Sequence, residues 1–284
     1  MSIFKSLTFA GKDLREFGVV CSGSHTFNGA ERDYTAVTIP GRNGELLLHG
    51  TRLKNIEVSY DCSIAPYFEG ADFEKQIQAL RGFLMTLVGY KKLIDGYHPD
   101  EYRQACYSGP LEAEVGALNR WGKFTLTFTC KPQRYLISGG EGITIAAGGS
   151  VTLTNPDGCG AAMPTFDIPG DPNGTVTEST ETVKNYSDSL SDALKSLAKD
   201  IQGVVDDAAG YVQVGSTKIH VQLAGVTEMV LDCGARRAYE KDGSRDLTHY
   251  ISAPDGFPKF PAGDTVVENH TANDITIYPN WFRV

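Results

Sequence analysis

The amino-acid sequence predicts a mainly β protein with two domains: an α+β domain of antiparallel sheets and one helix over residues 1–137, and a β-sandwich over residues 143–284. Three observations lead to this prediction. The first half of the chain contains runs in which apolar and polar residues alternate. A run with helical spacing lies between two of them. The second half consists of short β runs separated by turn-rich stretches.

Alternation predicts the strands of the first domain. Residues 55–64 place Ile56 and Val58 on one side and polar residues on the other, as in a half-buried strand. Residues 123–131 repeat the pattern, and residues 111–115 repeat it more briefly. We therefore expect these segments to share one antiparallel sheet.

One amphipathic helix is predicted between these strands, within residues 70–89. Its apolar residues recur three and four positions apart, which places them on one helical face, and Asp72 is available as an N-cap. The residues of this face are Phe73, Ile77, Leu80, Leu84 and Leu87. The helix is expected to lie across the sheet.

A glycine-rich stretch over residues 139–149 predicts the domain boundary. Short β runs then begin at Ser150, Pro164, Lys218, Thr227 and Thr265. Turn-rich stretches such as residues 155–158 and 171–174 separate these runs. This succession is typical of a β-sandwich.

A helical insertion is predicted over residues 185–209, where apolar residues recur in alternating steps of four and three. The seam consists of Leu190, Leu194, Leu197, Ile201, Val204 and Ala208. Such a segment is too long for a sandwich loop. Two interpretations stay open: a helix that packs on its own sheet or hairpin, and a seam that docks another chain.

Composition restricts the classes of function. Of the 284 residues, 41% are apolar and 21% are charged, as in folded water-soluble proteins. We find no run of signal-peptide or membrane-spanning length, so neither export nor membrane insertion is expected. The formal net charge of -9 provides no basic field for a phosphate backbone. Specific nucleic-acid binding is therefore not expected.

The six cysteines are scattered, without the spacing of a zinc site. Their even number permits disulfides, but a chain of this size without an export signal favours reduced, buried thiols. We also find no phosphate loop, nucleophile elbow or metal-binding histidine motif. Glu112 and Glu114 alternate outward from a strand, which favours a solvated face over a glycosidase pair. The sequence thus indicates a binding or structural protein that has no catalytic residues, cofactor or metal.

The order of features over the first 135 residues resembles the distal tail proteins of long-tailed, non-contractile bacteriophages. The matching positions are Phe9 to Gly18, Arg32 to Tyr34, Pro40 to Gly44, Asn55 with Ile56, Lys92 with Leu93, Asp100 with Tyr102, and alternate positions from Gly122 to Pro132. The stretch around Phe260 resembles part of the family's C-terminal sandwich. Within the match, Pro40, Gly41, Arg42 and Gly44 are expected to form a turn between strands, because proline fixes φ and glycine tolerates positive φ.

The resemblance implies a structural hub at the tip of the virion tail, synthesised in the host cytoplasm. N-terminal domains would assemble into a hexameric ring that joins the tail tube protein to the tail-associated baseplate protein. C-terminal domains, galectin-like or similar to carbohydrate-binding modules, would project outward and carry receptor-binding proteins. The helical insertion departs from the family's pattern, and our hypothesis for it is a docking element for a neighbouring baseplate or receptor-binding protein through Leu194 and Ile201.

An alternative function is a carbohydrate-binding module that contacts a glycan of the host cell surface. Trp281 is the candidate contact, because an exposed indole can stack on a sugar ring. The same residue lies in an aromatic C-terminal strand, so burial in the core is the competing interpretation.

Overall fold

The computed structural model describes residues 6–25, 29–64, 73–115, 122–174 and 210–284. They form two units, one of residues 1–137 with 283–284 and the other of residues 138–282. Strands dominate both units, and α1 (Phe73–Thr86) is the single α-helix of the described residues. The prediction of a mainly β protein is therefore confirmed. The predicted helix over residues 185–209, with its whole seam from Leu190 to Ala208, lies outside the described residues.

The N-terminal unit is built on a nine-stranded sheet with the strand order β2-β1-β7-β8-β10-β6-β3, in which β9 and β21 also pair with β10. Its strands are β1 (Leu7–Phe9), β2 (Lys12–Asp13), β3 (Val19–His25), β6 (Ile56–Ile64), β7 (Lys91–Asp95), β8 (Glu101–Tyr107), β9 (Ala113–Val115), β10 (Gly122–Leu136) and β21 (Phe282–Arg283). A 3-10 turn, η1 (Leu14–Phe17), connects β2 to β3. The two longer alternating runs predicted from the sequence, residues 55–64 and 123–131, form β6 and β10. These strands pair antiparallel along nine positions from Gly122↔Ile64 to Cys130↔Ile56.

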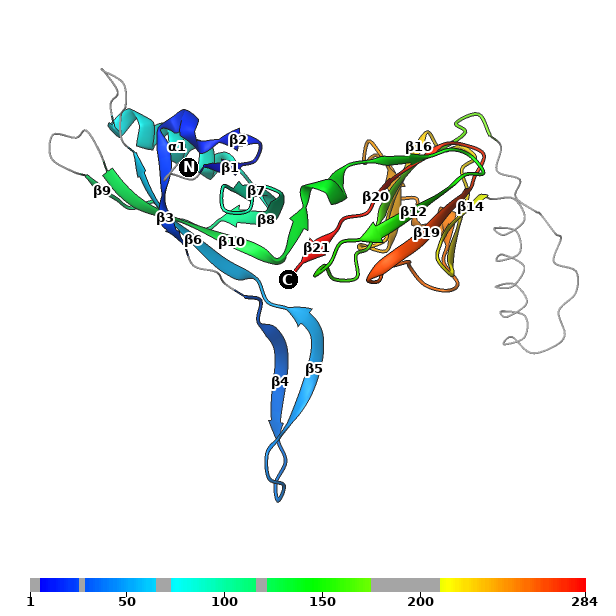
Figure 1. Cartoon of the computed structure of the whole chain (residues 1–284), viewed down its shortest axis with the longest axis horizontal. Coiled ribbons are helices and arrows are strands. Elements are labelled where there is room, and N and C mark those ends of the chain that lie inside the picture. The colour runs from blue at the N-terminus through cyan, green and yellow to red at the C-terminus, as the bar shows by residue number, and fades with distance from the viewer. Residues whose placement is uncertain (1–5, 26–28, 65–72, 116–121, 175–209) are drawn as a thin grey trace, which may run out of the picture. The chain divides into compact units, whose positions relative to one another are not determined.

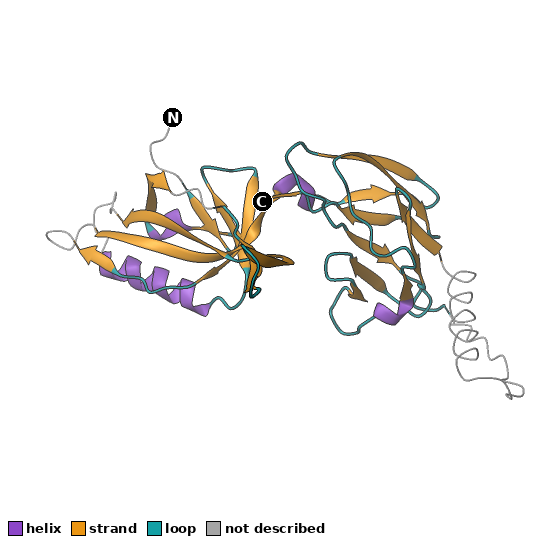
Figure 2. Ribbon diagram, turned by 90° about the horizontal axis from the view of Figure 1, so that it is seen from below, coloured by secondary structure: helices purple, strands orange, loops and turns teal. Residues whose placement is uncertain are grey.

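The core of this unit lies between the sheet and α1. The helix buries Phe73, Ile77, Leu80 and Leu84, the face that the sequence spacing predicts. These side chains belong to the same buried cluster as the apolar face of β6 and β10. Figure 2 shows α1 along one face of the sheet. The opposite face of β6 and β10 carries their polar residues.

Two further strands leave this sheet as a separate ribbon (Figure 1). Strands β4 (Arg32–Thr38) and β5 (Glu45–Leu53) pair only with each other, in a two-stranded antiparallel sheet. We call residues 32–53 the arm. The chain enters the arm after β3 and returns from it into β6.

The C-terminal unit is a β-sandwich of two five-stranded antiparallel sheets (Figures 1 and 2). One sheet has the order β11-β20-β13-β16-β17, with strands β11 (Ile143–Ile145), β20 (Ile275–Tyr278), β13 (Thr165–Pro169), β16 (Glu228–Asp232) and β17 (Arg237–Glu240). The other has the order β12-β19-β14-β15-β18, with strands β12 (Ser150–Asn155), β19 (Gly263–His270), β14 (Gly210–Val214), β15 (Thr217–Val221) and β18 (Ile251–Ser252). Short 3-10 turns are η3 (Ile137–Gly140) and η4 (Thr248–Tyr250).

Candidate interaction surface

The tip of the arm is a turn whose conformation follows from its sequence. Residues Pro40 to Gly44 connect β4 to β5, and the Arg42 amide donates a hydrogen bond of 3.2 Å to the Ile39 carbonyl. Gly41 and Gly44 have φ values of 79° and 82°, a conformation that residues with a Cβ rarely adopt. The structure thus places Pro40, Gly41, Arg42 and Gly44 at the tip of the arm.

The strand register gives the arm two apolar faces. Val37 pairs with Leu46, and Thr35 pairs with Leu48. Residues directly opposite each other in a sheet share a face, so these four side chains lie on one side of the ribbon. Ala36 pairs with Leu47, which places both on the other side, together with Tyr34.

These apolar side chains are open to solvent. Leu48 is 52% exposed and Tyr34 is 55% exposed, and Val37, Leu46 and Leu47 are also exposed. A two-stranded hairpin by itself is marginally stable in water. Both of its strands also present an unpaired backbone edge. A ribbon with apolar side chains on both faces and two open edges has the properties of a surface that another polypeptide covers.

Polar contacts anchor the arm at its root. The Lys54 amide donates to the Glu31 carbonyl at 2.9 Å, and the Lys54 Nζ lies 3.1 Å from a Glu31 carboxylate oxygen. Arg52 pairs with Asp33 at 3.9 Å. These ion pairs are solvent-exposed and therefore contribute little to stability. The backbone hydrogen bond, by contrast, continues the pairing of the ribbon to the point where β6 begins.

A second apolar surface lies at the end of α1. Met85 is 70% exposed and Val88 is 84% exposed. Tyr90 is also exposed; its hydroxyl accepts a hydrogen bond of 2.7 Å from the Asn55 amide, and the Lys131 ammonium lies 5.2 Å from its ring centroid. We call Met85, Val88 and Tyr90 the helix-end patch. It lies in the same unit as the arm but on different elements.

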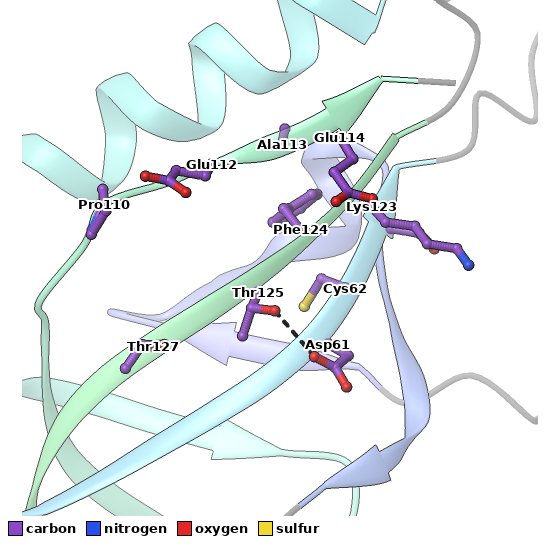
Figure 3. Close-up of a pocket in the computed structure, with 11 residues that line it drawn as sticks. Asp61, Cys62, Pro110, Glu112, Ala113, Glu114, Lys123, Phe124, Thr125 and Thr127 are labelled. Carbon is purple, nitrogen blue, oxygen red and sulfur yellow. Dashed lines mark hydrogen bonds between the residues drawn. The ribbon is translucent and has the colours of Figure 1, made fainter. Parts of the chain in front are cut away.

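A polar groove of about 840 Å³ follows the open face of β6, β9 and β10 (Figure 3). Asp61, Glu112, Glu114 and Lys123 line it, and Thr125 donates a hydrogen bond of 3.1 Å to Asp61. Glu112 and Glu114 are both exposed, as the alternation predicts for a solvated face. The groove resembles a hydrated sheet surface more than a closed site.

Cys62 also lines this groove, but its thiol is not activated. The hydrogen bond with Cys21, followed by burial, raises the pKa of Cys62. A thiol with a raised pKa is protonated at neutral pH and is a poor nucleophile. Among the described residues, no group of three His, Cys, Asp or Glu side chains converges as a metal site. The part of the chain that the structure describes has no helix of the length and apolarity needed to cross a membrane.

The C-terminal unit buries the residue predicted as a glycan contact. Trp281 is only 6% exposed, and its ring centroid lies 5.1 Å from that of Phe260, a core residue. A buried indole has no open face for a sugar ring, so the structure corrects this assignment in favour of a core role. A hollow of about 430 Å³ on the same unit is lined by Tyr239, Arg237 and Arg245 among others. Glycan binding stays a prediction.

Sequence reasoning located the turn of the arm but missed the arm as a surface. The signal was present in three consecutive leucines, Leu46 to Leu48, because alternation fails wherever both faces of a strand are apolar. The helix-end patch was missed because Met85 and Val88 fall outside the predicted buried face, where isolated apolar residues are common.

Residues 12–130 match the family model of the phage tail protein RIFT-related domain. No curated protein sequence matches the chain. Among solved structures, the SPP1 Dit (gp 19.1) protein, described as a paradigm of the hub adsorption apparatus in Gram-positive-infecting phages, is similar with a TM-score of 0.60 and 13% sequence identity over 98% of both chains. A chain of the phage p2 baseplate in its activated conformation with Sr has a TM-score of 0.49 and 8% identity, covering 99% of this chain and 98% of that one.

The family match agrees with the order of motifs in the first 135 residues, and the similarity to the SPP1 Dit protein agrees with the fold described above. Residues 12–130 of the N-terminal unit thus match a phage-tail domain, and the whole chain has the fold of the SPP1 Dit protein.

Proposed function

We propose that this protein is a structural hub of the phage tail tip, in which N-terminal units join into a ring through the arm. The observation that carries the proposal is the two-faced apolar ribbon of residues 32–53, which no other described segment of the chain covers. Leu46 and Leu48 are 43% and 52% exposed, so burying the rest of each side chain would stabilise a complex by roughly 1 kcal/mol each.

The partner of the arm is a second copy of the same chain. A closed ring needs a head-to-tail contact between two different surfaces of one subunit. The N-terminal unit offers both: the arm, and the helix-end patch with Met85 and Val88. Each subunit would then place its arm on the patch of the next, so that the apolar side chains of both surfaces are buried.

The ring is proposed to be hexameric and to join the tail tube protein to the tail-associated baseplate protein, with receptor-binding proteins attached further out. The resemblance to distal tail proteins and the phage-tail family match support this placement in the virion tail. The net charge of -9 is compatible with a channel through which DNA slides without binding. The role is structural rather than catalytic.

The experiment uses three variants of the full chain and measures mass by light scattering. The arm variant carries Leu46→Asp and Leu48→Asp, and the patch variant carries Val88→Asp. A control variant, Thr152→Asp, adds a charge at an exposed residue of β12 in the other unit. Because all four side chains are exposed, each variant should fold, as circular dichroism will check.

A head-to-tail contact predicts a specific pattern. The arm variant alone and the patch variant alone should lose ring assembly, because each lacks one half of every contact. Their equal mixture should form dimers and stop there, since the intact arm of one docks on the intact patch of the other. The control should assemble as the wild type does. Ring assembly by the arm variant would refute the proposal, and ring assembly by the patch variant alone would refute the helix-end patch as the receptor.

A further inference from the structure

We propose that Cys21 and Cys62 form a reversible disulfide that ties the edge strand β3 to β6 and closes the segment that contains the arm. The two residues are direct partners in the antiparallel ladder between these strands. Both side chains are buried, and their Sγ atoms lie 3.2 Å apart. Both cysteines are free thiols in the structure.

The backbone is already suitable for this bond. Opposite residues of an antiparallel pair have Cα atoms about 4.5 or 5.5 Å apart, depending on the hydrogen-bonding position. Both values fall within the range of about 4.4–6.8 Å found for disulfides. The two sulfur atoms need only a small side-chain movement to reach the bond length of about 2.05 Å. In contrast, the Cys130 and Cys106 thiols are directed to the backbone carbonyls of Phe128 and Tyr107.

The position of the pair connects it to the arm. The segment between Cys21 and Cys62 contains the whole arm, which leaves after β3 and returns through β6. Strand β3 is the last strand of its sheet, and its ladder with β6 shifts register directly after Cys21. Cys21 therefore ends the regular part of this ladder, and His25↔Tyr60 is the pair nearer the arm. A covalent bond at Cys21 would hold together the two strands from which the arm extends.

The chemistry is thiol–disulfide exchange with a small disulfide such as oxidised glutathione. One cysteine loses its proton, attacks the oxidant and forms a mixed disulfide, which releases one glutathione thiol. The second cysteine then loses its proton and attacks the mixed disulfide at the sulfur of the first, which releases the second glutathione. The protein loses two protons and two electrons, and the oxidant gains them to become two thiols.

Burial makes this exchange slow in the closed fold. The hydrogen bond between the thiols and their burial both raise the pKa of Cys62, so the reactive thiolate is scarce. Exchange therefore requires β3 to separate locally from β6. An edge strand can open in this way without disrupting the rest of the sheet.

The biological setting rests on the proposed function. A tail protein is made in the reducing host cytoplasm and then meets an oxidising exterior in the released virion. The thiols would stay reduced during assembly, and the disulfide would form afterwards, fixing the edge strand β3 to β6 in a subunit whose arm is already docked.

The test uses the wild-type full chain, held in mixtures of reduced and oxidised glutathione and then mapped by mass spectrometry of unreduced peptides. We expect a cross-linked peptide that contains Cys21 and Cys62, a loss of two free thiols and a thermal midpoint several degrees higher. Cys21→Ser should abolish the cross-link, whereas Cys130→Ser should retain it. Six free thiols in every mixture, or a cross-link between other cysteines, would overturn the proposal.

This outcome is independent of ring assembly. Peptide mapping reports the Cys21–Cys62 bond in a monomer as well as in a ring, and light scattering on the same samples reports the ring. The wild-type chain alone decides the question, so a Cys21→Ser chain that fails to fold removes a control and leaves the test intact.

Discussion

At the residue scale, some buried polar groups and closely packed glycines have roles that the hydrophobic pattern of the sequence does not predict. Asn269 is fully buried, and its amide nitrogen donates to the carbonyls of Ile145, Ala146 and Asn273 at 2.8–3.1 Å. Its side-chain oxygen accepts from the Thr271 amide and hydroxyl. Since β19 and β11 belong to different sheets, this one side chain joins the two layers of the sandwich. From sequence, Asn269 is only one polar residue at the end of a strand.

Gly122 provides a residue-scale prediction. A Cβ at this position would lie 2.4 Å from the ring of Phe73 and 2.9 Å from the Glu114 carbonyl oxygen. Gly122→Ala is therefore expected to lower the free energy of unfolding by about 1–3 kcal/mol. Gly82→Ala is the matched control: a Cβ at that exposed helical position meets nothing within 4 Å, so alanine should stabilise α1 by roughly 0.5–1 kcal/mol. Urea unfolding measures both, and a Gly122→Ala chain as stable as the wild type would contradict the packing described.

Buried thiols and a buried phenol predict how stability depends on pH. Burial raises the pKa of Cys130 to about 12, and it also raises the pKa of Cys233 and, aided by Asp95, that of Tyr60. In the unfolded chain these groups ionise near pH 8.5 for cysteine and about 10 for tyrosine. Above those values the unfolded chain releases protons that the folded chain retains, so folding stability falls as pH rises.

The expected slope is about 1.4 kcal/mol per pH unit for each such group once its unfolded form is ionised. Urea midpoints measured from pH 7 to 10 under reducing conditions should be level at first and then decline beyond about pH 8.5. Midpoints that stay level or rise over the alkaline range would show that these groups are not buried as described.

At the element scale, the sequence predicted the strands and the helix that bury one face in the core and expose the other face to solvent. Strands β6 and β10 and helix α1 were recognised because a single buried face imposes a period of two or of 3.6 residues. The arm escaped because neither of its faces is buried within the chain. Apolar residues on both faces of a strand leave no period of two in the sequence, and we propose that these leucines serve a partner chain. For the same reason, Trp281 could be a core residue or a surface contact until the sandwich showed its neighbours.

At the scale of the whole molecule, we propose a different role for each of the two units. The N-terminal unit contains the phage-tail domain and both apolar surfaces of the proposed ring contact. The C-terminal unit is a sandwich with a closed core, and the attachment of outer proteins or a host glycan to it stays a prediction. The order of motifs in the sequence predicts a ring role, which stays a prediction, whereas the two apolar surfaces proposed for the ring contact became visible only in the structure.

The central claim is that copies of this chain close into a ring, and its most direct test is the mass of the wild-type protein by light scattering across a concentration series. The account predicts a species of six times the 30.8 kDa chain mass that grows with concentration and appears as rings in negative-stain images. An open-ended series of larger masses, or a strict monomer at every concentration and also when mixed with the tail tube protein, would contradict it.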